Sequence, residues 1–299
     1  MRFTIAHRTR YRYPVPVHES HTIVHLQPRS DLSQYCTRYE LTVSPRARVF
    51  SYADRFGNDV QHFAVLPEHD TLEIVAHSQV VTARGKPKAP PPVRRAEVDA
   101  DPAVLDMWDF LHESRYVRFG GELDALADAI GTPGADDDLA AWFRAASKAI
   151  HDGFTYETGT TTVRTTVEES IAMRRGVCQD FAHVLIALCR RAGVAARYVS
   201  GYVHSGGGET LGAEASHAWA EAYLGPQGWV GIDPTNDTWI GDQFVRIATG
   251  RDYRDVSPVR GTYVGASSST MAVDVAVEAL SPAQQREPSL REQQEQQQQ

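Results

Sequence analysis

The stretch from Arg174 to Val194, RRGVCQDFAHVLIALCRRAGV, decides how the rest of the chain is interpreted. Gly176 indicates a turn, after which a helix is predicted to begin near Cys178 and to end at Gly193. Cys178 would stand in the first turn, where free backbone amides and the helix dipole favour the nucleophilic thiolate form of cysteine. Cys189, in mid-helix among apolar neighbours, is predicted to be a core residue. The apolar residues that recur at helical spacing are Phe181, Val184, Leu185 and Leu188.

Two segments further along the chain offer a base and an acid to that cysteine. In SHAWAEAYL, large and small side chains alternate with the period of a strand, which puts His217 and Trp219 on one face. A turn, GPQG, leads to a second predicted strand, WVGIDPTND, in which Pro234 follows Asp233 and closes the strand. Two strands joined in this way form a hairpin that can bring a histidine and a carboxylate together on one face.

The register of this hairpin is open at this stage. A loop centred on Gly225 would place His217 and Asp233 directly opposite each other, because they are equally far from that residue. A tighter turn centred on Pro226 and Gln227 would shift the pairing by about one strand pair or more. In either case the carboxylate is expected to accept the Nδ1 proton of His217, which leaves Nε2 to deprotonate the cysteine.

The remainder of the chain divides into an N-terminal domain, a linker and a core. Residues 1–85 contain short alternating strands between turn signals, which predicts a small antiparallel β-domain. A proline-rich linker is expected over residues 86–98, since consecutive prolines lack amide donors. Residues 99–280 are expected to form the core. Residues 281–299 are rich in glutamine, have almost nothing apolar to bury, and are expected to be a disordered tail.

Two helical patterns open the core. The segment DPAVLDMWDFLHES has an Asp-Pro start signal and places Leu105, Trp108 and Leu111 on one side. The segment DDDLAAWFRAASKAIHDGF has acids ahead of its first turn and an apolar stripe that includes Trp142 and Phe143. That stripe is expected to be core and not the lining of a cofactor site.

Composition excludes several classes of protein. The 299 residues are 42% hydrophobic and carry a net charge of −8, which argues against a nucleic-acid-binding surface. The pairs Arg94–Arg95, Arg174–Arg175 and Arg190–Arg191 are expected on the solvated surface. No segment approaches the ~20 apolar residues of a membrane span, and the N-terminus lacks a signal-peptide core, so no membrane partner is expected. Three cysteines form no disulfide framework, and a cytoplasmic location is expected.

The blocks GVCQDFA, SHAWAEAYL and GWVGIDPTND resemble, in this order, the Cys, His and Asp blocks of the transglutaminase-like superfamily. The later GRDYRDVSPVRG is similar to a segment of bacterial members, and the β-rich start resembles the N-terminal region that often precedes their core. The resemblance covers most of the chain. It implies an α+β, papain-like core with a nucleophile helix packed on an antiparallel sheet, and it carries over Cys178, His217 and Asp233 as the catalytic residues.

The same resemblance implies cysteine-dependent amide hydrolysis or acyl transfer on peptide or glutamine-like substrates, through a thioester acyl-enzyme. No acidic calcium loop is present, so neither a metal nor another cofactor is expected. One oxyanion donor is expected to be the Cys178 backbone amide. Tyr156 is expected to pack over the thiol, Gln179 and Asp180 to cap the helix start, and Trp219 to support the site.

Each of these residues also has a purely structural interpretation. Cys178 could be a small buried hydrophobe, His217 a satisfied strand histidine, and Asp233 a strand-ending residue. A metal site built from the three is disfavoured, since no CxxC or HxxxH pair accompanies them. His183, five positions after Cys178, is expected to be a surface or packing residue. The alternative function is a non-catalytic peptide- or protein-binding module on the same fold. A separate hypothesis is that the N-terminal β-domain recruits a macromolecular partner or restricts entry to the cleft.

Overall fold

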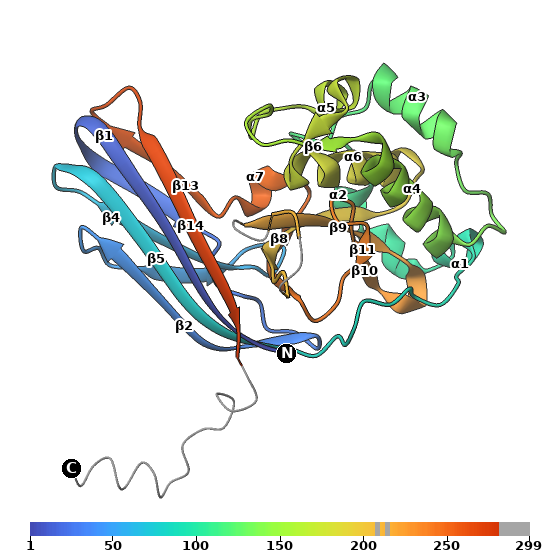
Figure 1. Ribbon diagram of the computed structural model, residues 1–299, viewed down its shortest axis with the longest axis horizontal. Helices are drawn as coiled ribbons and strands as arrows, with labels where there is room; N and C mark the ends of the chain where they lie inside the picture. The colour runs from blue at the N-terminus through green and yellow to red at the C-terminus, as the bar shows by residue number, and fades with distance from the viewer. Residues whose placement is uncertain (207–209, 213–215, 281–299) are drawn as a thin grey trace, which may run out of the picture.

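The computed structural model describes residues 1–206, 210–212 and 216–280, and the predicted tail 281–299 lies outside them. A sheet of long strands forms one unit, and a smaller sheet with helices around it forms the other (Figure 1). None of the helices in the described ranges is long and apolar enough to cross a membrane.

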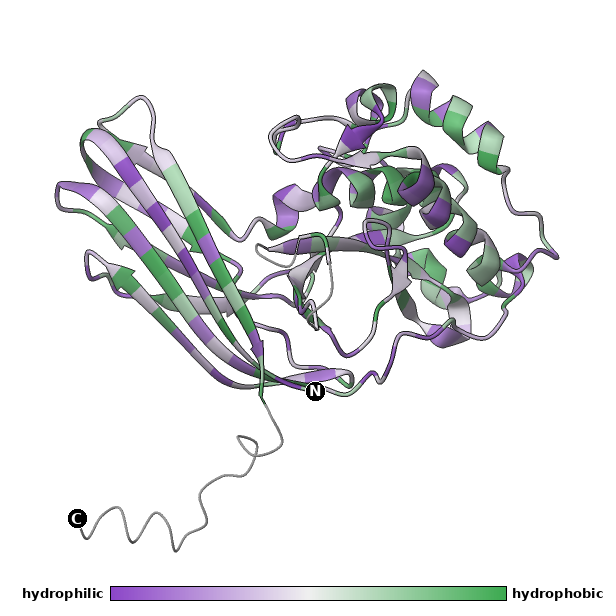
Figure 2. Cartoon of the chain, viewed as in Figure 1, coloured by the Kyte–Doolittle hydropathy of each residue, from purple (hydrophilic) through white to green (hydrophobic). Residues whose placement is uncertain are grey.

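The first unit is an antiparallel sheet in the order β2-β5-β1-β4-β3. Its long strands alternate hydrophobic and hydrophilic residues (Figure 2), as expected when one face of each strand is buried. In β1, for example, Phe3 and Ile5 are buried. The predicted β-rich N-terminal region is confirmed. Its strands are β1 (Arg2–Val24), β2 (Gln34–Ser44), β3 (Phe50–Ala53), β4 (Asp59–Val65) and β5 (His69–Thr82).

Two strands from the other end of the chain complete this sheet. β13 (Val259–Val264) and β14 (Thr270–Ala279) both pair with β1, and β14 does so from Phe3↔Ala279 to Arg12↔Thr270. In Figure 1 the red β14 lies beside the blue β1. The structure therefore differs from the expected core of residues 99–280 at its C-terminal end. A local pattern identifies a strand but not a partner that is more than 200 residues away.

The second unit is built on a five-stranded antiparallel sheet in the order β11-β10-β9-β8-β12. The helix α6 (Cys178–Arg191) packs on its central strand, where alternate alanines give one face that is flat enough for the helix to approach closely. These alanines are Ala218, Ala220 and Ala222. The strands are β8 (Ala196–Val203), β9 (His217–Tyr223), β10 (Trp229–Asp233), β11 (Thr238–Trp239) and β12 (Phe244–Gly250).

Further helices surround α6. The predicted helix α4 (Leu139–Gly153) is confirmed: Asp138 caps its first turn, Phe143 is buried, and Trp142 packs against the core. A parallel pair of two-residue strands, β6 (Thr155–Tyr156) and β7 (Arg175–Gly176), leads into α6. The remaining helices are α1 (Arg95–Asp99), which begins inside the expected linker, α3 (Gly121–Ile130), α5 (Val167–Met173) and α7 (Tyr253–Val256).

The prediction of one helix over the segment DPAVLDMWDFLHES is wrong. Residues Pro102–Asp106 form a 3₁₀ turn, followed by a four-residue helix, α2 (Trp108–Leu111). Leu105 is 84% exposed and Trp108 is 68% exposed, and of the expected apolar side only Leu111 packs against the core. A periodic pattern gives a stable helix only when tertiary packing covers it.

The arginine pair at the end of α6 is only partly on the surface, so the expectation for Arg190 is wrong. Its side chain is buried, and its guanidinium donates hydrogen bonds to the backbone carbonyls of Phe110, Ala196 and Arg251. Arg191 instead pairs with Asp124 at the surface. A fork of five donors can satisfy several chain segments at once, which explains how a buried cation is tolerated here.

Two side chains of the first unit close the free edge of the second sheet. The amide of Asn58 accepts from the backbone N–H of Thr249 and donates to its carbonyl, both at 2.8 Å. The amide of Gln34 does the same for Arg246, at 2.8 and 2.7 Å. Each amide thus replaces one residue of a neighbouring strand. The edge strand β12 is therefore paired on both sides and presents no unpaired edge there.

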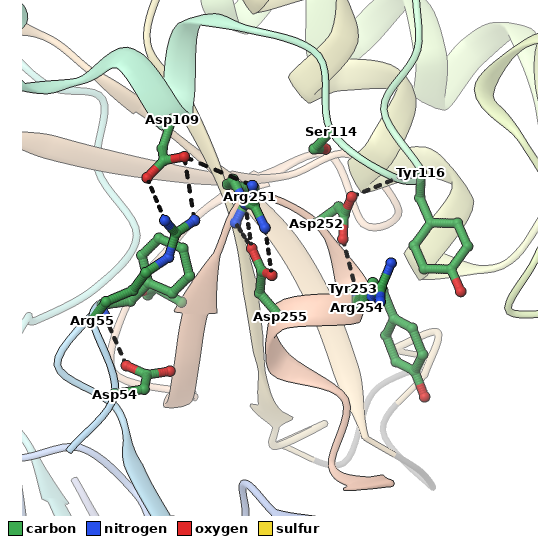
Figure 3. Close-up of polar contacts among 12 residues, drawn as sticks. Asp54, Arg55, Asp109, Ser114, Tyr116, Arg251, Asp252, Tyr253, Arg254 and Asp255 are labelled. Carbon is green, nitrogen blue, oxygen red and sulfur yellow. Dashed lines mark hydrogen bonds and ion pairs between the residues drawn. The ribbon is translucent and has the colours of Figure 1, made fainter.

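An ion-pair network also joins the two units (Figure 3). Arg55, in the turn between β3 and β4, pairs with Asp109 of α2 at 3.2 Å. Asp109 also lies 3.7 Å from Arg251, which pairs with Asp255 at 2.8 Å. The expected β-domain is thus held against the core by backbone pairing, side-chain amides and charge.

Candidate active site

Three element ends meet at the candidate site. Cys178 is the first residue of α6, His217 is the first residue of β9, and Asp233 is the last residue of β10. All three are buried, and Cys178 retains 8% of its surface exposed. The helix start brings free backbone amides to the thiol, while the neighbouring strands bring the imidazole and the carboxylate to one place.

The imidazole of His217 is bound to Asp233 through Nε2. The Nε2···Oδ2 distance is 2.8 Å, and both side chains are fully buried. Asp233 also accepts from the backbone amide of Thr235 at 2.9 Å and from the side-chain amide of Asn236 at 2.8 Å. Three donors therefore fix the carboxylate against the ring. Asn236 was missed from the sequence, although it lies in the same DPTND block as the acid.

The imidazole ring of His217 is oriented opposite to the prediction, with Nε2 toward Asp233. Nδ1, expected to bond Asp233, is instead buried and has no hydrogen-bond partner of normal geometry among the described residues. The thiol of Cys178 adjoins the ring and helps to raise its pKa. Because Asp233 occupies Nε2, Nδ1 is the nitrogen that can exchange a proton with the thiol. A long catalytic hydrogen bond is common in an enzyme without substrate.

Charge decides the protonation of His217. Burial lowers the pKa of this imidazole, but the Asp233 carboxylate and the Cys178 thiolate outweigh burial and raise it to about 10. A protonated His217 ring is thus favoured at neutral pH.

The hairpin follows the tighter of the two registers considered. The pairing Trp229↔Tyr223 centres the turn on Pro226, and a short 3₁₀ turn covers Gly225–Gln227. Continuing that register places Asp233 one strand pair away from direct opposition to His217. The two side chains still meet diagonally, because same-face residues offset by two positions remain within reach of long side chains.

Asp180 fixes the start of the nucleophile helix. Its carboxylate accepts from the backbone amide of Val177 at 2.8 Å and from the hydroxyl of Thr161 at 2.7 Å. A Cβ on Gly176 would lie 2.5 Å from this carboxylate, so only glycine leaves room for it. Asp180 therefore caps the helix as expected, whereas the Gln179 side chain makes no hydrogen bond in the described ranges.

The remaining expected residues occupy the surroundings of the thiol. Burial raises the pKa of Tyr156 to about 12, with contributions from Cys178 and Asp233, so its hydroxyl stays protonated beside the thiol. Its ring meets Phe181 edge to face at 6.4 Å. Trp219 is fully buried, packs on Phe244 at 5.4 Å, and supports the ring of His217 from a distance of 6.5 Å.

His183 is a packing residue inside the protein. It is buried, stacks on Tyr116 at 5.9 Å, and accepts a hydrogen bond from the backbone amide of Tyr253 at 3.1 Å. Burial lowers its pKa to about 4 and keeps the ring neutral. Among the residues that are described, no group of three or more His, Cys, Asp or Glu side chains is placed to hold a metal ion.

A short loop segment lies over the imidazole. The backbone of Leu211 exchanges two hydrogen bonds with the Asn236 side chain, at 3.0 and 3.2 Å. The next residue, Gly212, has φ +80°, and a Cβ there would lie 2.5 Å from Nδ1 of His217. Asn236 therefore holds both the carboxylate of the pair and the segment that covers its base.

Comparison with known proteins agrees with this fold. Residues 124–234 match the model of the transglutaminase-like superfamily, and residues 3–81 match that of the bacterial transglutaminase-like N-terminal region. The chain belongs to the transglutaminase-like superfamily.

Individual relatives extend over nearly the whole chain. The uncharacterized Mycobacterium tuberculosis protein Rv2569c is 34% identical over 300 aligned residues, which span 93% of this chain and 92% of that protein. The uncharacterized Mycobacterium leprae protein ML0607 is 31% identical over 283 residues, spanning 93% and 99%. A candidate cysteine protease from Cytophaga hutchinsonii has a similar crystal structure, with a TM-score of 0.71, 26% identity, and coverage of 94% of this chain and 92% of its own. The expected family and its papain-like α+β core are confirmed.

Proposed function

We propose that this protein is a cysteine-dependent amide hydrolase or acyltransferase, in which Cys178 is the nucleophile, His217 carries the proton and Asp233 orients the histidine. The observation that carries the proposal is the His217–Asp233 bond at 2.8 Å, which leaves a buried nitrogen beside the thiol at the start of α6. The membership of the transglutaminase-like superfamily supports the same assignment.

The proposed reaction starts from a Cys178 thiolate and a protonated His217. The Cys178 thiolate attacks the carbonyl carbon of an amide, and the negative charge moves to the carbonyl oxygen, where the helix-start amide of Cys178 can stabilise it. Nδ1 of His217 gives its proton to the departing amine as the carbon–nitrogen bond breaks. A thioester remains on Cys178, and Asp233 keeps the ring in place through Nε2.

The acceptor decides the product. Water, deprotonated by Nδ1, releases a carboxylic acid, whereas a primary amine at the same position yields a new amide. We propose hydrolysis as the main outcome, because the structurally similar Cytophaga hutchinsonii protein is a candidate cysteine protease. The substrate is proposed to be a peptide or protein, and the three free cysteines fit a reducing, cytoplasmic setting.

Alkylation of Cys178 by iodoacetamide between pH 5 and 9 tests the pair without a known substrate. Mass spectrometry of the peptides would report Cys178, with buried Cys189 and half-buried Cys36 as internal references. We expect Cys178 to react at pH 6 nearly as fast as at pH 8, because the imidazolium keeps the thiol ionised. His217→Ala is expected to convert this into the steep rise of an ordinary thiol of pKa about 8.5.

Two results would contradict the proposal. One is an ordinary thiol profile for Cys178 in the unmodified protein, which would favour the non-catalytic peptide-binding module. The other is a Cys178→Ala protein that retains amide hydrolysis on a peptide library, since no thioester can then form. Cys36→Ala serves as the matched control, because Cys36 lies in β2 of the first sheet.

A further inference from the structure

Four arginines from separate parts of the chain line one cavity, which lies where β13 of the first sheet meets the second unit. The cavity has a volume of about 850 Å³ and is lined by Arg115, Tyr116, Arg164, Thr166, Arg254 and Arg260. These residues come from the segment between α2 and α3, the start of α5, α7 and β13. We call them the arginine cluster.

None of the four guanidinium groups of this cluster forms an ion pair with a carboxylate in the described part of the chain. Arginines elsewhere are commonly paired: Arg251 with Asp255, Arg197 with Glu221, and Arg144 with Asp237. The buried carboxylate next to the cluster, Asp252, is occupied by the backbone amides of Tyr116 and Arg254, at 2.8 and 2.9 Å. All four arginines are exposed, and Arg260 donates to the backbone carbonyl of Arg254 at 3.3 Å. Together they form a positive patch on an otherwise acidic protein, which favours the binding of an anion between them.

The arginine cluster adjoins the nucleophile. Tyr116 stacks on His183 at 5.9 Å, and Tyr253, which precedes Arg254, donates its backbone amide to the same histidine. Burial raises the pKa of the Tyr253 hydroxyl, and the nearby Tyr116 and Cys178 raise it further, so Tyr253 lies between the cluster and the thiol. Figure 3 shows Tyr116, Tyr253 and Arg254 together on one side of Asp252. A ligand held by the cluster would therefore extend toward the thiol.

We propose that the arginine cluster binds carboxylate groups of the substrate, so that the enzyme acts on acidic peptides whose carboxylates flank the reacting amide. This inference rests on the proposed function, because that function makes the ligand a peptide. Guanidinium groups bind carboxylates through paired N–H donors, which fixes both position and orientation. A cavity of this size holds one or two acidic side chains, whereas the net charge of −8 disfavours a long polyanion.

A pair of alkylating reagents tests the cluster in the full-length protein. Iodoacetate carries a carboxylate and iodoacetamide does not, while both transfer a carbon to the thiolate and release iodide. We expect Arg164→Gln with Arg254→Gln to slow iodoacetate at Cys178 about fivefold and to leave iodoacetamide unchanged. The matched control is Arg46→Gln with Arg48→Gln, exposed arginines of the first unit whose loss changes the net charge equally. An unchanged ratio of the two rates would overturn the inference.

Peptide binding separates this inference from the proposed function. In a Cys178→Ala protein, a labelled peptide with glutamates on both sides of a glutamine is compared with its all-glutamine twin. We expect roughly tenfold tighter binding of the acidic peptide, lost when Arg164 and Arg254 are also replaced. Equal binding of both peptides would overturn the inference, as would an arginine-dependent retention on phosphatidylserine vesicles without any peptide preference. If Cys178 resists both reagents while acidic peptides still bind, the proposed function fails and the cluster remains a carboxylate site.

Discussion

At the scale of single residues, access to the base of the candidate site depends on one glycine. Gly212 adopts a left-handed conformation directly over Nδ1 of His217, where a methyl group has no room. The substitution Gly212→Ala is expected to displace the ring or the loop segment, and to lower both Cys178 alkylation at pH 6 and amide hydrolysis by about tenfold or more.

The control for this substitution lies in the same loop. Gly206 also has a positive φ, of +59°, but a Cβ there meets nothing within 4 Å. Gly206→Ala therefore carries a similar backbone strain of about 1 kcal/mol without the clash. Equal losses of activity in the two variants would show that backbone strain, and not contact with the imidazole, is responsible.

A second residue-scale prediction concerns the buried carboxylate of Glu221. Burial raises its pKa, but the guanidinium groups of Arg246 and Arg197 outweigh burial and lower it to about 2. Glu221→Gln would leave the buried Arg197 without a carboxylate partner and Arg246 with Asp31 alone, so we expect a loss of about 3–5 kcal/mol in the free energy of unfolding, measured with urea. Glu73→Gln, which breaks a partly exposed pair with Arg10, should cost less than about 1 kcal/mol.

The sequence identified the residue types of the candidate site but not their orientation. Cys178, His217 and Asp233 are predictable because each stands in a readable helix or strand and because the three blocks resemble, in order, those of the transglutaminase-like superfamily. The turn of the imidazole was predicted wrongly, since nothing in the local pattern says which nitrogen faces the helix. Asn236 and Gly212 were missed because their roles depend on two loops that meet only in three dimensions.

At the scale of the elements, the edge strand β12 depends on side chains from the other unit. We expect Asn58→Ala to lower the free energy of unfolding by about 2–4 kcal/mol, because it leaves the backbone N–H and C=O of Thr249 buried without partners. Gln79→Ala, an exposed position on β5, is the control and should change it by less than about 0.5 kcal/mol. A loss no larger than that of the control would mean that water replaces the amide at this edge.

Elements with local signals were predictable, and those that depend on distant partners were not. The helices α4 and α6 follow from periodic apolar residues with a cap or a glycine at an end. The pattern around Leu105 has the same period, but most of its apolar side stays exposed, and it forms only a 3₁₀ turn and the four-residue helix α2. The segment around Asn58 looks like an ordinary turn in the sequence, and its pairing with β12 appears only once both sheets are in place.

At the scale of the whole molecule, a neutral histidine lies where the two units meet. His7 of β1 bonds the hydroxyl of Tyr202 in β8 at 2.8 Å, and burial lowers the pKa of His7 to about 4. In the unfolded chain this histidine binds a proton below about pH 6.5, while in the folded protein it does not. Folding stability is therefore expected to fall as the pH decreases from 6.5 to 4, by about 1.4 kcal/mol per unit from this group.

Urea unfolding at pH 7.0, 5.5 and 4.5 would measure this effect. His7→Gln keeps a polar group at the interface but cannot take up the proton, so its stability should depend less steeply on pH than that of the parent. His62→Gln is a suitable control, because His62 is exposed on β4. Identical pH dependence in the parent and in His7→Gln would assign the acid sensitivity to other groups.

The pairing of β1 with β14 has a consequence for folding during synthesis on the ribosome. β1 is synthesised well before β14, because Phe3 and its partner Ala279 are 276 residues apart in the chain. At ~5–20 residues per second, β1 waits on the order of 10–50 s with one side open to other chains. Until β14 has been synthesised, the nascent chain thus exposes an unpaired strand edge. The yield of folded protein in cells should therefore depend on chaperones that shield this edge.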